Sequence, residues 1–449
     1  MVRIHAFRLR SLAAGALLAV GFCGSAGAIS LEEAYQAALK NDPTFRMRYY
    51  ENESGKENRI LGRAQLLPQV SANYSYSQNV TDRETFQGAN LPPRIDHPKY
   101  DSRSAVVQLR QPLFNMDAIQ RYRQGKVQSA QAEQAYEAGI DEVSVRVVSA
   151  YMDVLFAEDQ LALARVQRDM YAEQQKVNDF LFQKGEGTKT DSLETQARLD
   201  LAEAQLVEAQ DHVVAVRNTL AGVIGMDPGT LDQLGPNFRP VTLDVASFEE
   251  WRKLALERNN TLAAARLGVE NSRLDINRNR AGHLPRVDFV AAYSKSDSES
   301  LNLLGTESTN RSLGVQVNIP IYQGGAINAQ TRQAAATYGR AQAELDARTN
   351  ETLIELRRAH DLVMSSGRKI DALVKAVDSS KELMKATEQS IKGGVRINLD
   401  LLTAQQTLFT SQRDLAQARY SYLVGLMRLR AASGTLAPDA IREIGAFFR

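Results

Sequence analysis

Two segments of the chain alternate apolar and small polar residues with a period of two. After Pro68, positions 70, 72, 74 and 76 are apolar or aromatic, and the positions between them are Ser or Asn. Residues 313–321 repeat the pattern with Leu, Val and Ile on one side. This period places each kind of side chain on its own face of a β-strand. Such strands fit between lipid and a wet lumen, although a strand half buried in a soluble sandwich has the same pattern.

Other segments favour very long helices. Residues 113–183 contain no proline and only Gly125 and Gly139 as glycines, and residues 321–392 contain no proline. At 1.5 Å per residue, each run would extend roughly 100 Å. Apolar positions 147, 151, 154 and 155 form a stripe at helical spacing, which positions 177, 180 and 181 continue. Thin stripes of this kind are typical of helices that pack as coiled coils. Residues 190–225 and 248–282 predict two helices of half that length.

The chain reads as a tandem duplication. "SLEEAYQAALKNDP" from Ser30 matches "SFEEWRKLALERNN" from Ser247 at an offset of 217, and "QLRQPLF" matches "QVNIPIY" at an offset of 208. The nine-residue difference indicates a shorter loop in the second copy. Glu33 and Glu250 stand where each copy would form a capping box with its serine. We expect a first repeat over residues 29–225, a connector over 226–247, a second repeat over 248–432 and a tail over 433–449.

Residues 1–28 have the pattern of a secretory signal peptide. Three arginines precede an apolar run, which ends in the small residues 26–28. The run is too short for a spanning helix. The only cysteine, Cys23, lies within this signal peptide, so we expect no disulfide and no cysteine metal site in the mature chain.

The mature composition argues against nucleic-acid binding and catalysis. Removing the three leader arginines changes the formal charge from +1 to −2, and a nucleic-acid partner would require a basic excess. No metal-binding or nucleophile motif accompanies the scattered histidines, which are His97, His212, His283 and His360. We expect no cofactor, no metal and no enzyme activity.

The strand count constrains how such a chain could enter a membrane. The pattern predicts four strands per chain, two in each repeat. A closed bacterial barrel needs about eight, and an open sheet edge cannot face lipid. Several chains must therefore share one barrel, with eight strands from two chains or twelve from three.

The chain resembles the TolC family of outer-membrane efflux and secretion proteins. The resemblance lies in the "LEEA…NDP" opening, the paired "LP" dipeptides, the "QPLF" and "IPIYQGG" segments and the closing "ARYSYLVGLMRLRAASGTL". It implies a mainly α fold with a β-barrel portion, in which a homotrimer shares one twelve-stranded barrel in the lipid of the cell outer membrane. A long α-helical tunnel would lie in the periplasm, with an equatorial collar to which residues 226–247 and 433–449 contribute.

The resemblance also implies a passive export duct. In lacking a lipidated cysteine and in having the "GEGTKTD" segment, the chain is more similar to the type I protein-secretion branch of the family. The partners in that branch are a periplasmic membrane-fusion adaptor and an inner-membrane ABC transporter. One alternative is the outer-membrane component of a multidrug efflux pump that works with a drug–proton antiporter on small-molecule cargo. A second alternative is a non-channel periplasmic coiled-coil scaffold, against which the alternating strand faces argue.

Two glycine-containing segments predict the turns of helical hairpins. They are "KGEGTKTDSLETQ" from Lys184 and "KGGVRINLDLLTAQ" from Lys392, 208 positions apart. The first lacks the full P-loop spacing and follows no strand, which argues against a phosphate site; a bare surface turn is the simpler alternative. We expect the glycines of the two segments to allow the chain to reverse tightly. They are Gly185, Gly187, Gly393 and Gly394.

The family resemblance implies that these tips form the constricted periplasmic mouth of the tunnel. Arg396 would bond to Thr190 and Asp191, latching a closed state, and Asp400 would face the entrance. Repeated in three chains, such partly shielded pairs amount to on the order of 3–6 kcal/mol.

Two tip positions depart from the family pattern. Ile391 stands where a tyrosine usually bonds to the first-tip aspartate, and Thr403 replaces a second inward aspartate. We therefore expect a weaker link and a single acidic ring.

Overall fold

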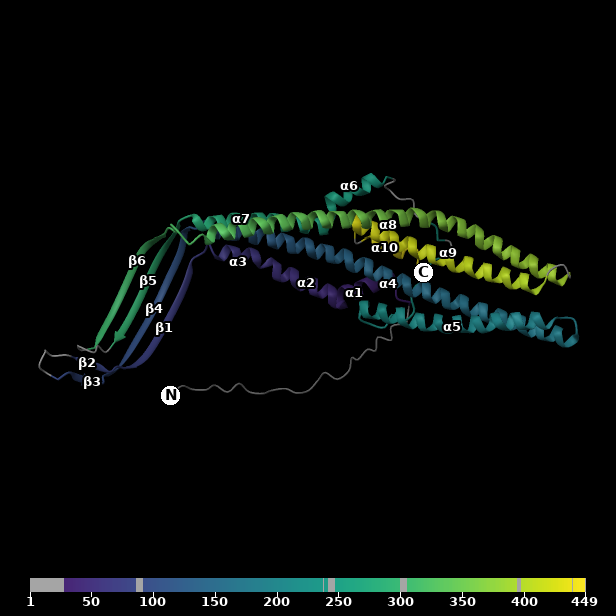
Figure 1. The fold of residues 1–449 in the computed structure, drawn as a ribbon, viewed down its shortest axis with the longest axis horizontal. Helices are drawn as coiled ribbons and strands as arrows, with labels where there is room; N and C mark the ends of the chain where they lie inside the picture. The colour runs from purple at the N-terminus through teal and green to yellow at the C-terminus, as the bar shows by residue number, and fades with distance from the viewer. Residues whose placement is uncertain are drawn as a thin grey trace, which may run out of the picture.

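In the computed structural model the chain is elongated, with a β-sheet at one end and two helical hairpins reaching the other (Figure 1). The structure describes residues 28–85, 92–236, 238–240, 247–298, 305–393, 397–437 and 439–448. The main sheet has the order β1 (Gln69–Val80), β4 (Lys99–Phe114), β5 (Arg286–Ser298) and β6 (Thr306–Asn318), with each neighbouring pair antiparallel. Beyond β1 and β4, the short strands β2 (Arg83–Thr85) and β3 (Arg94–Asp96) pair with each other.

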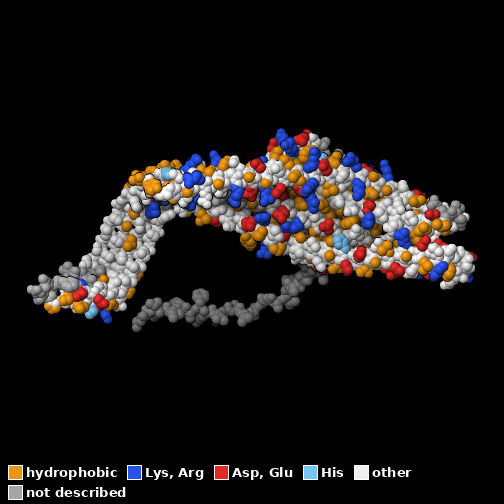
Figure 2. All heavy atoms as spheres, viewed as in Figure 1, with side chains coloured by type: hydrophobic (Ala, Val, Ile, Leu, Met, Phe, Trp, Pro, Cys, Tyr) orange, Lys and Arg blue, Asp and Glu red, His pale blue; other side chains and the backbone are white. Residues whose placement is uncertain are grey.

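The register confirms the alternation predicted for the strands. Tyr74 lies opposite Ala105, Val107 opposite Tyr293, and Ala291 opposite Leu313. One face of the sheet is therefore apolar, and the other carries the serines and asparagines between these positions. On the side seen in Figure 2, few charged side chains interrupt the middle of the strands. Within the described residues, β1 and β6 each pair on one side only, which leaves the sheet with two open edges.

The long helices continue directly from the strands. α4 (Met116–Lys184) has 69 residues and follows β4, and α8 (Ala326–Lys392) has 67 residues and follows β6. α3 (Asn58–Ala64) leads into β1, and α7 (Asn260–Arg280), with the 3₁₀ turn η1 (Ala281–His283), leads into β5. The remaining helices are α1 (Leu31–Asn41), α2 (Pro43–Lys56), α5 (Lys189–Ile224), α6 (Phe248–Arg258), α9 (Asn398–Ser433) and α10 (Asp439–Gly445). None of the described helices has a stretch apolar and long enough to cross a bilayer.

Two local expectations need correction. The single helix predicted over residues 248–282 is broken at Asn259, where the backbone is extended and the side chain caps α7 by accepting a hydrogen bond from Leu262 N at 3.0 Å. Ser30 forms the expected capping box with Glu33. Ser247 instead accepts from Glu249 N at 3.3 Å, one position earlier than expected, so the reciprocal box with Glu250 does not form.

The apolar core lies midway along the helices, where the first and last described residues approach the connector. Val147, Tyr151, Val154 and Leu155 are all 0% exposed, as their spacing predicts. The Tyr151 hydroxyl donates to the backbone oxygens of Ile29 at 2.9 Å and of Asp232 at 3.3 Å. Isolated bridges add two further contacts, namely Ile29 with Leu231 and Leu234 with Phe448.

The predicted stripe does not continue as core to the tips. Val177 and Phe180 are 50% and 58% exposed, whereas the neighbouring Asn178 is 5% exposed. The inner face of the hairpin near its tip is therefore polar and part of its outer face is apolar. Helical periodicity identifies an apolar face, but it does not distinguish a core contact from a contact with another protein.

Candidate functional site at the hairpin tips

The first tip reverses the chain through two glycines, one at a left-handed backbone position and one in a confined space. α4 ends at Lys184, and Gly185 has a φ of 77°, which L side chains rarely adopt. Its N–H and that of Glu186 donate to the last turn of α4, satisfying carbonyls that would otherwise lack a partner. A Cβ on Gly187 would lie 3.1 Å from Leu181 Cβ. Gly185 and Gly187 therefore both permit the tight reversal.

Asp191 caps the helix that follows this turn. Its Oδ2 accepts hydrogen bonds from Thr188 Oγ1 at 2.6 Å and from Thr188 N at 3.3 Å, and its own N–H donates back to Thr188 Oγ1 at 3.1 Å. This capping box satisfies free N–H groups at the start of α5, where a negative charge is also favourable. The Thr-x-x-Asp spacing was the available signal for it. Thr190, one position earlier, is exposed in the same turn.

The second tip is described only in part. Gly393 has a φ of −86°, so its position does not require a glycine, contrary to the expectation. Gly394 and Arg396 lie outside the described residues, so the bonds from Arg396 to Thr190 and Asp191 stay a prediction. Asp400 lies in the first turn of α9, and its backbone N–H donates to Ile397 O at 3.1 Å.

The two positions that depart from the family pattern also lie in these helices. Ile391 is partly buried near the end of α8. Thr403 is exposed, and its hydroxyl donates to Leu399 O of its own helix at 2.8 Å. A hydroxyl occupied within its own helix does not replace an acidic side chain.

A ring of four neutral side chains joins the two hairpins, and the sequence interpretation missed it. Thr195 Oγ1 accepts from Asn178 Nδ2 at 2.8 Å and from Asn398 Nδ2 at 3.1 Å. Gln174 Nε2 donates to Asn178 Oδ1 at 3.0 Å and to Asn398 Oδ1 at 3.1 Å. Thr195 is 0% exposed, and buried bonds of this kind are costly to break without replacement. We call Gln174, Asn178, Thr195 and Asn398 the amide ring; it brings together α4, α5 and α9.

Further contacts hold the first hairpin together and join it to the second. Ser192 Oγ donates to Asp179 Oδ1 at 2.7 Å and Gln175 Nε2 donates to the same oxygen at 2.9 Å, and these bonds hold the pKa of Asp179 below its usual range. Farther from the tip, Tyr171, Ala202 and Leu402 form a small buried apolar cluster. The hairpins are thus attached to each other by both polar and apolar contacts.

The outer surface of the first hairpin carries exposed apolar side chains. Lys184 Nζ lies 5.5 Å from the ring centre of Phe180, and Lys189 Nζ lies 5.4 Å from that of Phe182. Exposed apolar side chains with charged neighbours are common at protein interfaces. The exposed set on α4 and α5 comprises Val166, Val177, Phe180, Phe182, Leu193, Leu201, Val207 and Val214.

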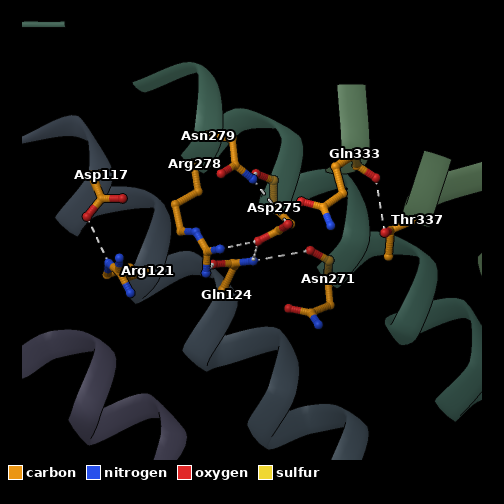
Figure 3. A network of polar contacts seen from close by, with 9 residues as sticks. All are labelled: Asp117, Arg121, Gln124, Asn271, Asp275, Arg278, Asn279, Gln333 and Thr337. Carbon is orange, nitrogen blue, oxygen red and sulfur yellow. Dashed lines mark hydrogen bonds and ion pairs between the residues drawn. The ribbon is translucent and has the colours of Figure 1, made fainter. Parts of the chain in front are cut away.

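At the opposite end, a polar network fixes the helices that support the sheet (Figure 3). Gln124 of α4 donates to Asp275 Oδ1 at 3.3 Å, and Arg278 pairs with the same carboxylate at 2.7 Å. Arg278 also donates to Gln124 Oε1 at 3.4 Å, which closes the link between α4 and α7. Nearby, Asp117 pairs with Arg121 at 2.8 Å. Because each carboxylate has an arginine partner, the network stabilises the junction. Across all the described residues, no group of three or more acidic, His or Cys side chains is placed to hold a metal.

Comparison with known proteins shows consistent similarity along the chain. The family model described as "Outer membrane efflux protein" matches residues 34–226 and 251–435. The chain is 38% identical over 423 residues to the alkaline protease secretion protein AprF of Pseudomonas aeruginosa, covering 94% of this chain and 88% of that protein. It is 37% identical over 433 residues to the proteases secretion protein PrtF of Dickeya chrysanthemi, covering 95% and 92%. It is 27% identical over 438 residues to the outer membrane protein TolC of Escherichia coli, covering 93% and 84%.

Solved structures show the same fold. The outer membrane protein VceC of Vibrio cholerae superposes with a TM-score of 0.75 at 18% identity, covering 90% of this chain and 96% of that one. The outer-membrane channel OprN gives a TM-score of 0.77 at 18% identity, covering 90% of each chain.

Proposed function

The chain belongs to the outer membrane efflux protein family, and we propose that it is the outer-membrane channel of a type I protein-secretion system. It is an outer-membrane protein with a TolC-like fold, whose helices form a tunnel on the periplasmic side. The family and its structural neighbours are channels rather than enzymes. In this role the chain is a passive duct, and other proteins supply the energy.

The observation that carries the proposal is the continuity of an amphipathic, open-edged sheet with long helices. Only Asn115 separates β4 from α4, so the sheet and helices form one continuous wall. Because hydrocarbon cannot satisfy the free edges of β1 and β6, further copies must pair with them. Three copies of a four-stranded sheet give the twelve-stranded barrel that the family resemblance implies. The described parts of 226–247 and 433–449 would then form a collar around the tunnel.

The type I assignment rests on two relatives. AprF and PrtF, at 38% and 37% identity, are named for the secretion of proteases. By this similarity the cargo is a protein, and the partners are a periplasmic adaptor and an inner-membrane ABC transporter. The exposed apolar side chains of the first hairpin provide a surface for a protein partner at the periplasmic end.

The second candidate is the outer-membrane component of a multidrug efflux pump. The family description and the outer membrane efflux protein BepC of Brucella suis, 26% identical over 397 residues, favour it. The lower identity places it second. In that case the energy source would be a drug–proton antiporter.

We further propose that the tips hold a closed resting state. Arg396 would bond to Thr190 and Asp191, and Asp400 would line the entrance. The amide ring adds a neutral link beside this ionic one. About 5.5 kcal/mol of differential binding shifts a two-state equilibrium from 1:99 to 99:1, which a partner that grips several helices could supply.

Gene deletion separates the two candidates. Loss of a secreted protein from the medium, with unchanged drug susceptibility and rescue by the wild-type gene, is the expected result. Increased drug susceptibility with normal secretion would favour the efflux pump, and no change in either would contradict both.

Single-channel recording tests the latch separately. Arg396→Ser and Asp191→Ala should each raise the conductance, whereas Thr403→Ala should not. Wild-type conductance in the first two variants would eliminate the ionic latch without affecting the channel assignment.

A further inference from the structure

The duplicated sheet carries the same tyrosine–arginine pair in both of its halves. Tyr76 lies directly opposite Arg103 in the β1–β4 ladder, and Tyr293 lies directly opposite Arg311 in the β5–β6 ladder. Each guanidinium carbon lies over the ring of its tyrosine, at 5.7 Å and 5.8 Å from the ring centre, within the range of a cation–π interaction. The tyrosines and the arginines are related by the two offsets of the repeat, 217 and 208.

Both arginines lie on the apolar face of the sheet, at the end farther from the helices. After Arg311 the apolar side chains Leu313, Val315 and Val317 follow at alternate positions of β6, and Ile319 and Ile321 continue the series beyond the end of the strand. They are 79%, 61%, 56%, 61% and 94% exposed. Arg311 and Ile321 are ten residues apart, as are Arg103 and Leu113.

Ten residues correspond to the thickness of the apolar band. At about 3.3 Å per residue and a tilt of roughly 40°, the segment from Arg103 to Leu113, which lies within β4, rises about 25 Å along the membrane normal, which is the height of the apolar band on barrels of this kind. Since the helices mark the periplasmic side, Arg103 and Arg311 lie at the level of the outer-leaflet headgroups.

Their hydrogen-bond donors are available at this level. Neither arginine forms an ion pair or a side-chain hydrogen bond with another described residue, whereas Lys295 on the same face pairs with Glu307. A cation–π contact with tyrosine does not use the N–H donors of the guanidinium. That planar fork matches the oxygens of a phosphate group.

We propose that Arg103 and Arg311, each held against its tyrosine, bind phosphate groups of outer-leaflet lipids. The inference rests on the proposed function, in which this sheet is inserted into the outer membrane, and it names the lipid group that the sheet binds. The Arg311 site is the stronger of the two, because Arg103 lies opposite Asp297 in the β4–β5 register and this carboxylate opposes an anionic ligand.

The experiment uses the assembled protein in phosphatidylcholine nanodiscs titrated with lipid A, a bisphosphorylated glycolipid. Native mass spectrometry counts the lipid retained. We expect Arg103→Gln/Arg311→Gln to weaken retention about tenfold or more, Arg311→Gln alone to account for most of this loss, and Arg→Lys at both positions to lose less. The charge-matched control is Arg258→Gln/Arg368→Gln, at exposed positions of the helical part, and should retain lipid A like the wild type.

Wild-type retention by Arg103→Gln/Arg311→Gln, or an equal loss in the control, would overturn the proposal. Complete displacement by inorganic phosphate at the same phosphate concentration would also overturn it, because the site would then take a free anion. Conductance of the same variant in phosphatidylcholine bilayers should equal that of the wild type, so failure of the lipid site is distinguishable from failure of the channel. If the double variant does not assemble, Arg311→Gln alone is compared with Arg368→Gln.

Discussion

Asn398 donates a hydrogen bond from Nδ2 to Thr195 Oγ1 at 3.1 Å, and this contact joins two residues 203 positions apart. It connects α9 of the second helical hairpin to α5 of the first. The bond is neutral and Thr195 is buried, so salt screens it much less than an exposed ion pair. Opening the tip by moving one hairpin away from the other requires this contact to break.

Replacing the acceptor of this bond should loosen the tip. Thr195→Val removes the acceptor shared by Asn178 and Asn398; Asn178 Nδ2 keeps a longer bond to Asp191 O at 3.4 Å, whereas the Asn398 donor loses its acceptor, at about 1–3 kcal/mol for an unsatisfied buried group. We expect a higher single-channel conductance. Thr407→Val is the control, because the Thr407 hydroxyl is exposed and donates to Thr403 O of its own helix at 2.9 Å. Equal conductance in the two variants would show that the amide ring does not hold the tip.

The capping box at the first tip predicts a local effect on α5. Thr188→Ala removes the side chain that accepts from Asp191 N, which should cost about 1 kcal/mol. Amide hydrogen exchange in the first turn of α5 should accelerate about fivefold, and Thr188→Ser should restore the wild-type rate. Unchanged exchange in the alanine variant would mean that the cap contributes little in solution.

Asp141 predicts a pH-dependent contribution to stability. Burial raises the pKa of its carboxyl group from 3.8 to about 6, although Asn260 Nδ2 donates to it at 2.9 Å. Because the folded pKa is raised, the stability contributed by this group is present below pH about 4 and is lost as the pH rises through 6. A shift of two units corresponds to at most about 3 kcal/mol, which solvent screening reduces to on the order of 1 kcal/mol.

Asp141→Asn should therefore raise the thermal unfolding midpoint at pH 7.5 and have little effect at pH 4. The asparagine oxygen can still accept from Asn260. The control is Asp211→Asn, at an exposed position of α5, which should leave the midpoint unchanged at both pH values. A gain from Asp141→Asn that is equal at both pH values would contradict the electrostatic explanation.

The ion pair between Arg146 and Asp42 should be among the most sensitive in the helical part. The Asp42 side chain is 4% exposed, and it also caps α2 by accepting from Thr44 N at 2.8 Å. Arg146→Met leaves a buried carboxylate without a cation, so we expect a loss of about 3–5 kcal/mol in the free energy of unfolding. Arg348→Met removes only an exposed pair with Glu351 and should cost less than about 1 kcal/mol. Comparable losses in the two variants would rule out this explanation.

The large elements of the fold were predictable because their periods extend over many residues. Alternation over residues 313–321 and the absence of proline over residues 113–183 specified a strand and a long helix. Asn259 was missed as a helix break because asparagine occurs both within helices and as a cap. Val177 and Phe180 were expected in the core because they continue the apolar stripe of the helix. A helical period does not show whether an apolar face packs against the same chain or against another protein.

The candidate site was predictable only where it is local. The Thr-x-x-Asp spacing from Thr188 indicates the helix cap, and Gly185 indicates the turn. The amide ring depends on three helices meeting at Asn178, Thr195 and Asn398, and single polar residues in amphipathic helices carry no sign of such a partner. Their pairing follows from the tertiary structure alone.

The open edges of β1 and β6 also affect how the protein must be made. A newly exported copy presents two rows of unpaired backbone groups beside an exposed apolar face, a combination that promotes aggregation. In the proposed shared barrel these edges are covered only when copies pair, so we expect barrel formation to depend on the concentration of the chain to a power above one. A low level of the chain should then reduce the number of pores more than in proportion.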